Sequence, residues 1–110
     1  MRIETELMRG VGPTAVLKLL ERGEMYGYEL VQKLAKQGDG ALGMGQSTLY
    51  PMLYNLEAKG LVASRVTESK SARPRRYYRL TTRGRKHLEK QQQQWQAVTK
   101  AMTSLGIAGA

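Results

Sequence analysis

The sequence contains no cysteine, no phenylalanine, one histidine and three prolines among its 110 residues. Without cysteine the chain has no disulfide, no thiolate metal site and no thiol nucleophile. A lone histidine also argues against an imidazole-based metal site. The longest uncharged run, residues 40–56, holds three Gly, a Pro, an Asn and a Gln, so we predict no membrane span. The first ten residues carry two Glu and no apolar core segment, so we expect no signal peptide.

Acidic residues are scarce in one stretch of the chain. Residues 1–64 hold seven basic and seven acidic side chains, whereas residues 65–90 hold ten basic and two acidic ones, a local charge of +8 within a total of +9. A cluster of charges of one sign usually contacts phosphate groups or an anionic membrane surface. The alternative is that these side chains are simply solvated. Together these features predict a small, soluble, cytoplasmic protein that binds a polyanion and needs no cofactor and no metal.

The apolar periodicity predicts five helices. We expect a short helix within residues 1–10, an interruption at Gly10 to Gly12, and a second helix that Pro13 opens. A further helix is expected from about Tyr26 to Gln37, followed by a glycine-rich connector over residues 38–45. The next helix is expected to start at a cap, Ser47 or Gln46, and to run to about Lys59.

Two strands and a long helix follow. Residues 61–67 and 75–80 alternate in polarity and flank a polar turn, which predicts an antiparallel hairpin with an arginine-rich outer face. Thr81 then caps a helix that extends to about Leu105. Leu88, Trp95 and Met102 are seven residues apart, as are Gln91, Val98 and Leu105, which is the spacing of a helix–helix seam. A domain of this size cannot bury so long a helix, so the seam predicts a homodimer.

This order of elements predicts a mainly α fold with a small β-hairpin, a winged helix-turn-helix. We divide the chain into residues 1–10, a helix that contributes to the dimer, residues 11–80, the DNA-binding domain, residues 81–105, the dimerisation helix, and residues 106–110, a frayed tail. The dimerisation residues predicted from the apolar positions are Ile3, Leu7, Leu88, Trp95, Val98, Met102 and Leu105.

The candidate DNA-binding residues fall into three groups. Those on the polar side of the helix expected at 47–59 are Ser47, Thr48, Tyr50, Pro51, Tyr54 and Asn55, which can meet phosphates or base edges. Those on the hairpin are Lys70, Arg73, Arg75 and Arg76, for which the alternative is a solvated tip. Gly27 and Tyr28 start a helix that can approach phosphate. The alternatives are that Ser47 acts only as a helix cap, that Tyr50 or Tyr54 covers the core, and that Gly27 packs against the preceding helix.

Several motifs occur in a specific order along the chain. They are Met8-Arg9-Gly10, Tyr26-Gly27-Tyr28-Glu29-Leu30, Ser47-Thr48-Leu49-Tyr50-Pro51, Gly60-Leu61-Val62 and Arg76-Tyr77-Tyr78-Arg79-Leu80-Thr81 with Gly84-Arg85. On these motifs the sequence resembles the PadR family of bacterial transcriptional regulators, over nearly its whole length. Its length resembles the short subfamily with a single C-terminal dimerisation helix.

The resemblance implies a homodimeric repressor that binds double-stranded DNA at a palindromic operator. Many members of the family release DNA when a small aromatic compound binds, and Trp95 on the seam is the candidate effector-binding residue. The alternative for Trp95 is a packing anchor in the dimer core. The helix with the Ser47-Thr48 motif has Tyr54 and Asn55 where the family often has basic residues, so it has little capacity for bidentate guanine recognition.

Three other functions compete with this interpretation. A non-sequence-specific architectural DNA-binding protein would carry the same charge. An enzyme is disfavoured because the acidic residues are scattered and His87 has no evident partner. A membrane-surface protein is disfavoured because no apolar face accompanies the basic block, so we predict no membrane partner. We also expect nucleoid association when the protein is bound to DNA.

Overall fold

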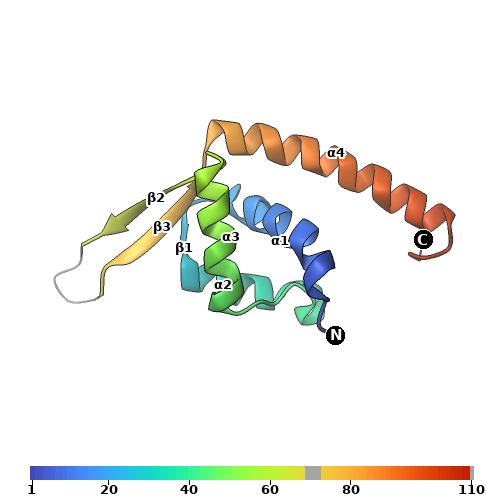
Figure 1. Cartoon of the computed structure of the whole chain (residues 1–110), viewed down its shortest axis with the longest axis horizontal. Helices are drawn as coiled ribbons and strands as arrows, with labels where there is room; N and C mark the ends of the chain where they lie inside the picture. The colour runs from blue at the N-terminus through green and yellow to red at the C-terminus, as the bar shows by residue number, and fades with distance from the viewer. Residues whose placement is uncertain (69–72, 110) are drawn as a thin grey trace.

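The computed structural model describes residues 1–68 and 73–109, in four helices and a three-stranded sheet. Figure 1 shows helices α1, α2 and α3 gathered beside the sheet, while α4 leaves this body and extends to one side. The molecule measures 55 × 30 × 21 Å. In chain order the elements are α1 (Thr5–Leu20), β1 (Met25–Tyr26), α2 (Gly27–Ala35), the 3-10 turn η1 (Gln37–Gly40), α3 (Gln46–Ala58), β2 (Val62–Thr67), β3 (Arg75–Leu80) and α4 (Thr82–Ser104).

Helix α1 is continuous, so the predicted interruption at Gly10 to Gly12 is wrong. Gly12 is buried, and a Cβ atom there would lie 2.6 Å from the Cε atom of Met52 on α3. The close approach of two helices therefore explains this glycine. Pro13 lies inside the helix and does not open it.

Helix α3 already includes Gln46 and Ser47, so neither of the two predicted caps precedes it. Its N-cap is Gly45, which has extended backbone angles, and no side chain caps the helix. The interpretation of Ser47 as a helix cap is therefore wrong, and its hydroxyl lies on the exposed surface of the first turn. The glycine-rich connector before α3 contains the turn η1, in which Gly38 and Asp39 adopt left-handed angles, with φ of 54° and 56°.

The predicted hairpin is confirmed as β2 and β3, which pair antiparallel with Ser64 opposite Tyr78 and Arg65 opposite Tyr77. We call this hairpin the wing. A strand that the periodicity did not predict, β1, pairs with the other edge of β3, so the sheet order is β1-β3-β2. Through β1 the start of α2 is attached directly to the wing.

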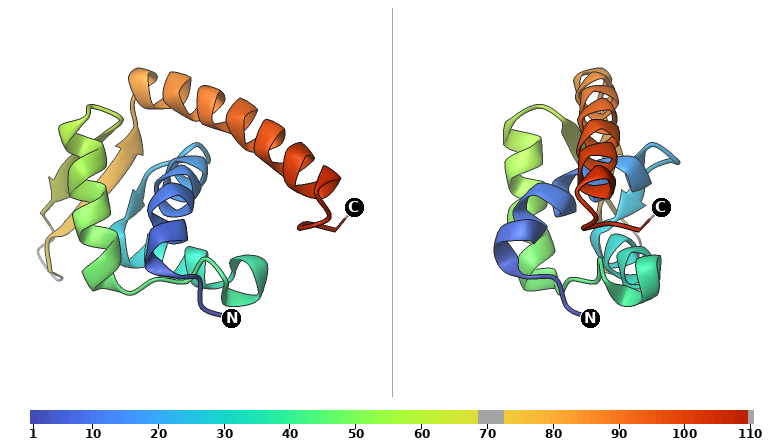
Figure 2. Two further views of the ribbon diagram at one scale, coloured as in Figure 1. Left: turned by 45° about the vertical axis from the view of Figure 1, so that its right-hand side comes forward. Right: turned by 90° about the vertical axis from the view of Figure 1, so that its right-hand side faces the viewer.

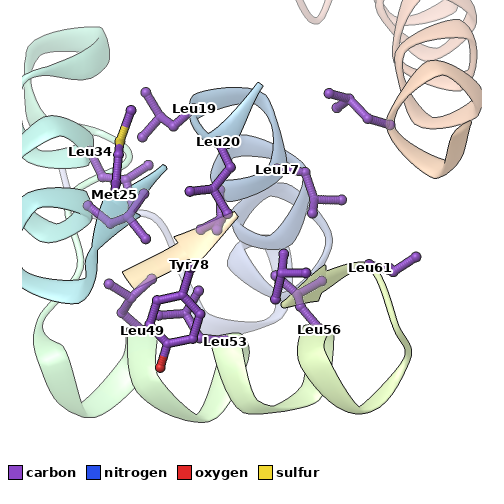
Figure 3. Close-up of a cluster of buried hydrophobic side chains, with 14 residues drawn as sticks. Leu17, Leu19, Leu20, Met25, Leu34, Leu49, Leu53, Leu56, Leu61 and Tyr78 are labelled. Carbon is purple, nitrogen blue, oxygen red and sulfur yellow. The ribbon is translucent and has the colours of Figure 1, made fainter. Parts of the chain in front are cut away.

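The core lies between α1, α2, α3 and the root of the sheet (Figure 3). Its fully buried side chains include Leu17, Leu30, Leu49 and Leu53. Leu88 of α4 is also fully buried in this cluster. The prediction that Leu88 contacts a second subunit is therefore wrong, because its side chain exposes no surface to one.

The start of α4 is fixed to the domain. The prediction that Thr81 caps this helix is confirmed. The Thr81 Oγ1 atom accepts a hydrogen bond from the Gly84 N–H at 2.9 Å. Further along, Thr14 and Lys18 of α1 bond to Gln91 and Gln92 of α4.

The distal part of α4 projects beyond the domain, as the two views in Figure 2 show. Trp95, Val98, Met102 and Leu105 remain 38 to 73% exposed there. We call these four residues the seam. Within the described residues, no helix has the length and apolar character needed to cross a membrane.

Candidate nucleic-acid interface

Helix α3 buries one side and exposes the other. Leu49, Leu53 and Leu56 face the core. The exposed side carries the predicted DNA-binding residues of this helix, namely Ser47, Thr48, Tyr50, Pro51, Tyr54 and Asn55. Tyr54 is 74% exposed, so the alternative that it covers the core is wrong. The predicted polar side of the helix is therefore a surface that can enter a DNA groove.

Six of the predicted residues come together around one hollow of about 730 Å³ between α2, α3 and the wing. These six are Gly27, Tyr28, Tyr50, Arg73, Arg75 and Arg76, and Tyr26, Pro74 and Tyr78 complete the lining. Tyrosine and arginine residues from three elements that are far apart in sequence thus line one hollow. Their hydroxyl and guanidinium donors suit the phosphate oxygens of a nucleic-acid backbone.

Gly27 is required by the close packing of α2 against α3. A Cβ atom at this position would lie 2.5 Å from Cε1 of the Tyr50 ring, so the absence of a side chain lets α2 approach Tyr50 of α3. Tyr50 is 42% exposed. Gly27 therefore leaves room for the Tyr50 ring at the edge of the hollow.

Replacing Gly27 with alanine is expected to push the Tyr50 ring away and to weaken DNA binding more than folding. The exposed ring can rotate into solvent, so the unfolding free energy should change by less than about 1 kcal/mol. Binding should lose about 1 kcal/mol if the Tyr50 hydroxyl donates to a phosphate. Thermal unfolding and DNA titration of Gly27→Ala and Tyr50→Phe would check this. Equal DNA affinity in all three proteins would contradict the role of Tyr50.

The outer face of the wing carries an aromatic pair and two arginines. The Tyr26 and Tyr77 rings meet edge to face with centroids 5.6 Å apart. The Arg75 guanidinium lies 4.5 Å from the Tyr26 centroid and that of Arg65 lies 5.3 Å from the Tyr77 centroid. Stacking of this kind orders a guanidinium group while leaving N–H donors at its edge.

Arg65 is also held by an acidic residue before β1. Its Nε atom donates to Oε2 of Glu24 at 2.9 Å, and its Nη2 atom donates to Oε1. These hydrogen bonds from the guanidinium lower the pKa of the Glu24 carboxyl. Arg65 thus contributes less free positive charge than the sequence count implies.

The inner face of the wing, toward α3, carries a chain of three polar groups. The Arg76 Nη1 atom donates to Oγ of Ser64 at 3.0 Å, and the Ser64 hydroxyl donates to Oε2 of Glu57 at 2.6 Å. Burial raises the pKa of the hydroxyl of the neighbouring Tyr78. Arg76 is therefore oriented by α3, and it lies on the opposite face of β3 from Arg75.

A second hollow, of about 410 Å³, joins the start of α3 to the N-terminal segment. Its lining includes Arg2 and Arg9 beside Ser47 and Thr48. Residues 1–10 were predicted to contribute to the dimer, and their two arginines were not predicted as neighbours of α3. The signal was present in Arg9 of the Met-Arg-Gly motif, but only the packing of α1 against α3 brings it to this place. Lys70, which was also predicted, lies outside the described residues.

The comparisons with known proteins agree with this geometry. A family model described as the transcriptional regulator PadR-like family matches residues 16–90, more than half of the chain. A transcriptional regulator from Clostridium thermocellum is 29% identical, with a TM-score of 0.83 over 93% of this chain and 96% of its own. A PadR family transcriptional regulator from Eggerthella lenta is 38% identical, with a TM-score of 0.80 over 91% and 85% of the two chains.

A third solved structure, a PadR-like transcriptional regulator from Bacillus cereus, is 28% identical, with a TM-score of 0.80 over 94% of this chain and 99% of its own. The motifs on which the resemblance rests lie on the elements just described. The Gly27 motif starts α2, the Ser47 motif starts α3, and the Tyr77-Tyr78 motif forms β3. The match thus covers both the fold and the surface that can meet DNA. The chain belongs to the PadR-like family of transcriptional regulators.

Proposed function

We propose that the chain is a homodimeric, sequence-specific repressor that binds a palindromic operator and leaves it when a small aromatic molecule binds. The hollow between α2, α3 and the wing carries this proposal, because tyrosine and arginine residues line it beside the exposed side of α3. On this account α3 enters the major groove, and Ser47, Thr48 and Asn55 contact base edges or phosphates. The wing then holds the backbone. A regulator of this kind acts on chromosomal DNA in the bacterial cytoplasm.

The double variant Arg75→Ala/Arg76→Ala is expected to weaken binding to every DNA sequence alike. Loss of two phosphate contacts should reduce the slope of log K against log salt by about 1.8. A control with the same charge change, Arg22→Ala/Lys100→Ala, removes cations outside the proposed surface. Fluorescence anisotropy at several salt concentrations would measure both slopes. If the two variants behave alike, the wing arginines do not hold the backbone.

The seam supports the proposed dimer. Trp95, Val98 and Met102 lie on α4 beyond the part that the domain covers, and Leu105 is the C-cap of this helix. All four remain exposed in the single chain. Leu7 on α1 is 61% exposed, whereas Ile3 is half-buried beside α3 and contributes less. A two-fold axis through such a contact would place two α3 helices in successive major grooves, about 34 Å apart. A dimer bound in this way at a promoter would exclude RNA polymerase and so repress transcription.

A hollow between α1 and α4 supports the proposed effector site. It measures about 530 Å³ and is largely apolar, with Val11, Ala15 and Trp95 in its lining. In a dimer, two Trp95 rings near the axis could enclose a flat ligand. Trp95 is the single tryptophan of the chain, so its fluorescence reports directly on this site. A panel of planar aromatic compounds should quench it and release DNA. Quenching without release would contradict the proposed release mechanism, and no quenching at all would leave Trp95 with a packing role only.

Selection of bound fragments from genomic DNA, followed by footprinting, tests the proposed function. The expected result is one class of site, with two symmetric half-sites whose centres are about 10 base pairs or a multiple of this apart. A family of unrelated fragments bound with equal affinity would favour the architectural alternative.

A further inference from the structure

A cluster of basic side chains lies apart from the surface described above. Lys59, Arg83, Lys86, His87 and Lys90 line a hollow of about 370 Å³ whose floor is Leu61. We call these five residues the basic stripe. None of them lines the hollow between α2, α3 and the wing. The proposed function therefore leaves this concentration of charge unused.

The stripe results from the helical period of α4. Arg83, Lys86, His87 and Lys90 have the spacing i, i+3, i+4, i+7, which places them on one side of the helix. Leu88, which is buried in the core, lies on another side. The axial distance from Arg83 to Lys90 is about 10 Å. Lys59, the C-cap residue of α3, supplies the fifth side chain from a second element.

The cations of the stripe have no acidic partner within the described part of the chain. The two ion pairs found there are Lys18 with Glu21 and Arg65 with Glu24. Lys59, Arg83, Lys86 and Lys90 are exposed, and their side chains make no hydrogen bond to another described residue. Four uncompensated cations so close together repel one another, and a bound polyanion relieves that repulsion.

The stripe lies at the opposite end of α3 from the residues proposed to enter the groove. Ser47 and Lys59 are about 18 Å apart along the helix axis. Figure 1 shows the start of α4 beside the end of α3, with the wing extending from the same end. A duplex that holds the start of α3 in one groove can therefore extend along the molecule to the C-terminal end of α3, where the basic stripe lies.

We propose that the basic stripe is a second, sequence-independent contact to the backbone of the same DNA duplex, outside the recognition helix and the wing. This inference rests on the proposed DNA-binding function and extends its footprint. Exposed lysines in a row of about 10 Å suit successive backbone phosphates, because such contacts need charge and reach but no fixed geometry. No buried polar group in the described lining is placed to orient a small ligand.

The test compares two variants with the same net charge. Lys86→Gln/Lys90→Gln removes two cations of the stripe, and Arg85→Gln/Lys100→Gln removes two cations from other sides of the same helix. All four side chains are exposed, so thermal unfolding should be unchanged in both variants. Binding to a duplex isolated by the fragment selection is measured at several salt concentrations, together with hydroxyl-radical footprints.

The stripe variant should lose about tenfold in affinity, and its salt slope should fall by about 1.8, with shorter protection at the flanks. The control should keep the wild-type slope and footprint. Equal losses in the two variants would overturn the inference, because only net charge would then matter. Unchanged DNA affinity in both variants would also overturn the inference, and an acidic protein would then be the better candidate partner for the stripe. A wild-type protein that binds no duplex would instead refute the proposed function itself.

Discussion

Replacing Gly84 with alanine is expected to destabilise the protein by about 3 kcal/mol or more. A Cβ atom at this position would lie 1.9 Å from the carbonyl oxygen of Leu61, a distance that no packing adjustment of a side chain can relieve. The first turn of α4 would have to move away from the start of β2. An alanine normally favours a helix over glycine, so the expected sign is opposite to that of helix propensity.

The movement would break the hydrogen bonds that join α4 to the wing root. The Thr81 hydroxyl lies 2.7 Å from the Gly60 carbonyl oxygen and 3.0 Å from that of Leu61, and the Thr81 N–H donates to the Leu61 oxygen at 3.2 Å. Each such bond contributes about 1 kcal/mol. Leu88, one turn further along α4, would also lose part of its burial in the core.

Gly10→Ala provides the matched control for Gly84→Ala. Gly10 lies inside α1, and a Cβ atom there would meet nothing within 4 Å. This substitution should stabilise the protein by about 0.5 to 1 kcal/mol. Denaturant unfolding of both variants should be followed by circular dichroism at one protein concentration, since a dimer's stability depends on it. A Gly84→Ala protein as stable as the wild type would contradict the packing described here.

Replacing Val98 with proline is expected to abolish the dimer and to reduce operator affinity about 10²-fold or more. Proline removes the Val98 N–H and places its ring against the Gln94 carbonyl, which breaks or kinks a helix interior. Val98 is half exposed and lies beyond the α1–α4 hydrogen bonds at Gln91 and Gln92. The winged domain should therefore fold, while the two DNA-binding surfaces lose their linkage and the gain from bivalent binding.

Sedimentation at micromolar concentration and DNA titration would measure both effects. Val98→Ala keeps the helix and removes only the side chain, so it should weaken the dimer without abolishing it. A Val98→Pro protein that sediments as a dimer would exclude the seam as the subunit contact. Retention of full operator affinity by a monomer would contradict the bivalent mechanism.

Local patterns along the chain predicted most of the fold. Alternation of polarity at residues 61–67 and 75–80 predicted the wing, and Thr81 predicted the start of α4, because both signals act over a few residues. Strand β1 has two residues, too few for a period to be seen. The glycines before Pro13 predicted an interruption, which was wrong. Gly12 is there because α1 packs closely against Met52, and such tertiary packing leaves no signal in a local pattern.

The structure brings six of the predicted residues together around one hollow, but the contacts among the side chains of this region were not predicted. The exposed side of α3 followed from the positions of its leucines. The pairing of Arg65 with Glu24 joins residues 41 positions apart, and Arg76 reaches Glu57 only through Ser64. A charge count treats all wing arginines alike, whereas the structure shows two of them already engaged. Leu88 was placed on the dimer seam because a seven-residue period cannot distinguish the partner subunit from the chain's own core.

Sequence-specific DNA binding by this protein is tested by a titration of the wild-type protein with two labelled duplexes at two salt concentrations. One duplex carries the region upstream of the protein's own gene, and the other carries the same bases in shuffled order. We expect a preference of about 10³ or more for the natural sequence at both salt concentrations, with a salt slope that reports several phosphate contacts. Binding of equal affinity to both duplexes, followed by a fragment selection that yields no shared site, would contradict sequence-specific binding.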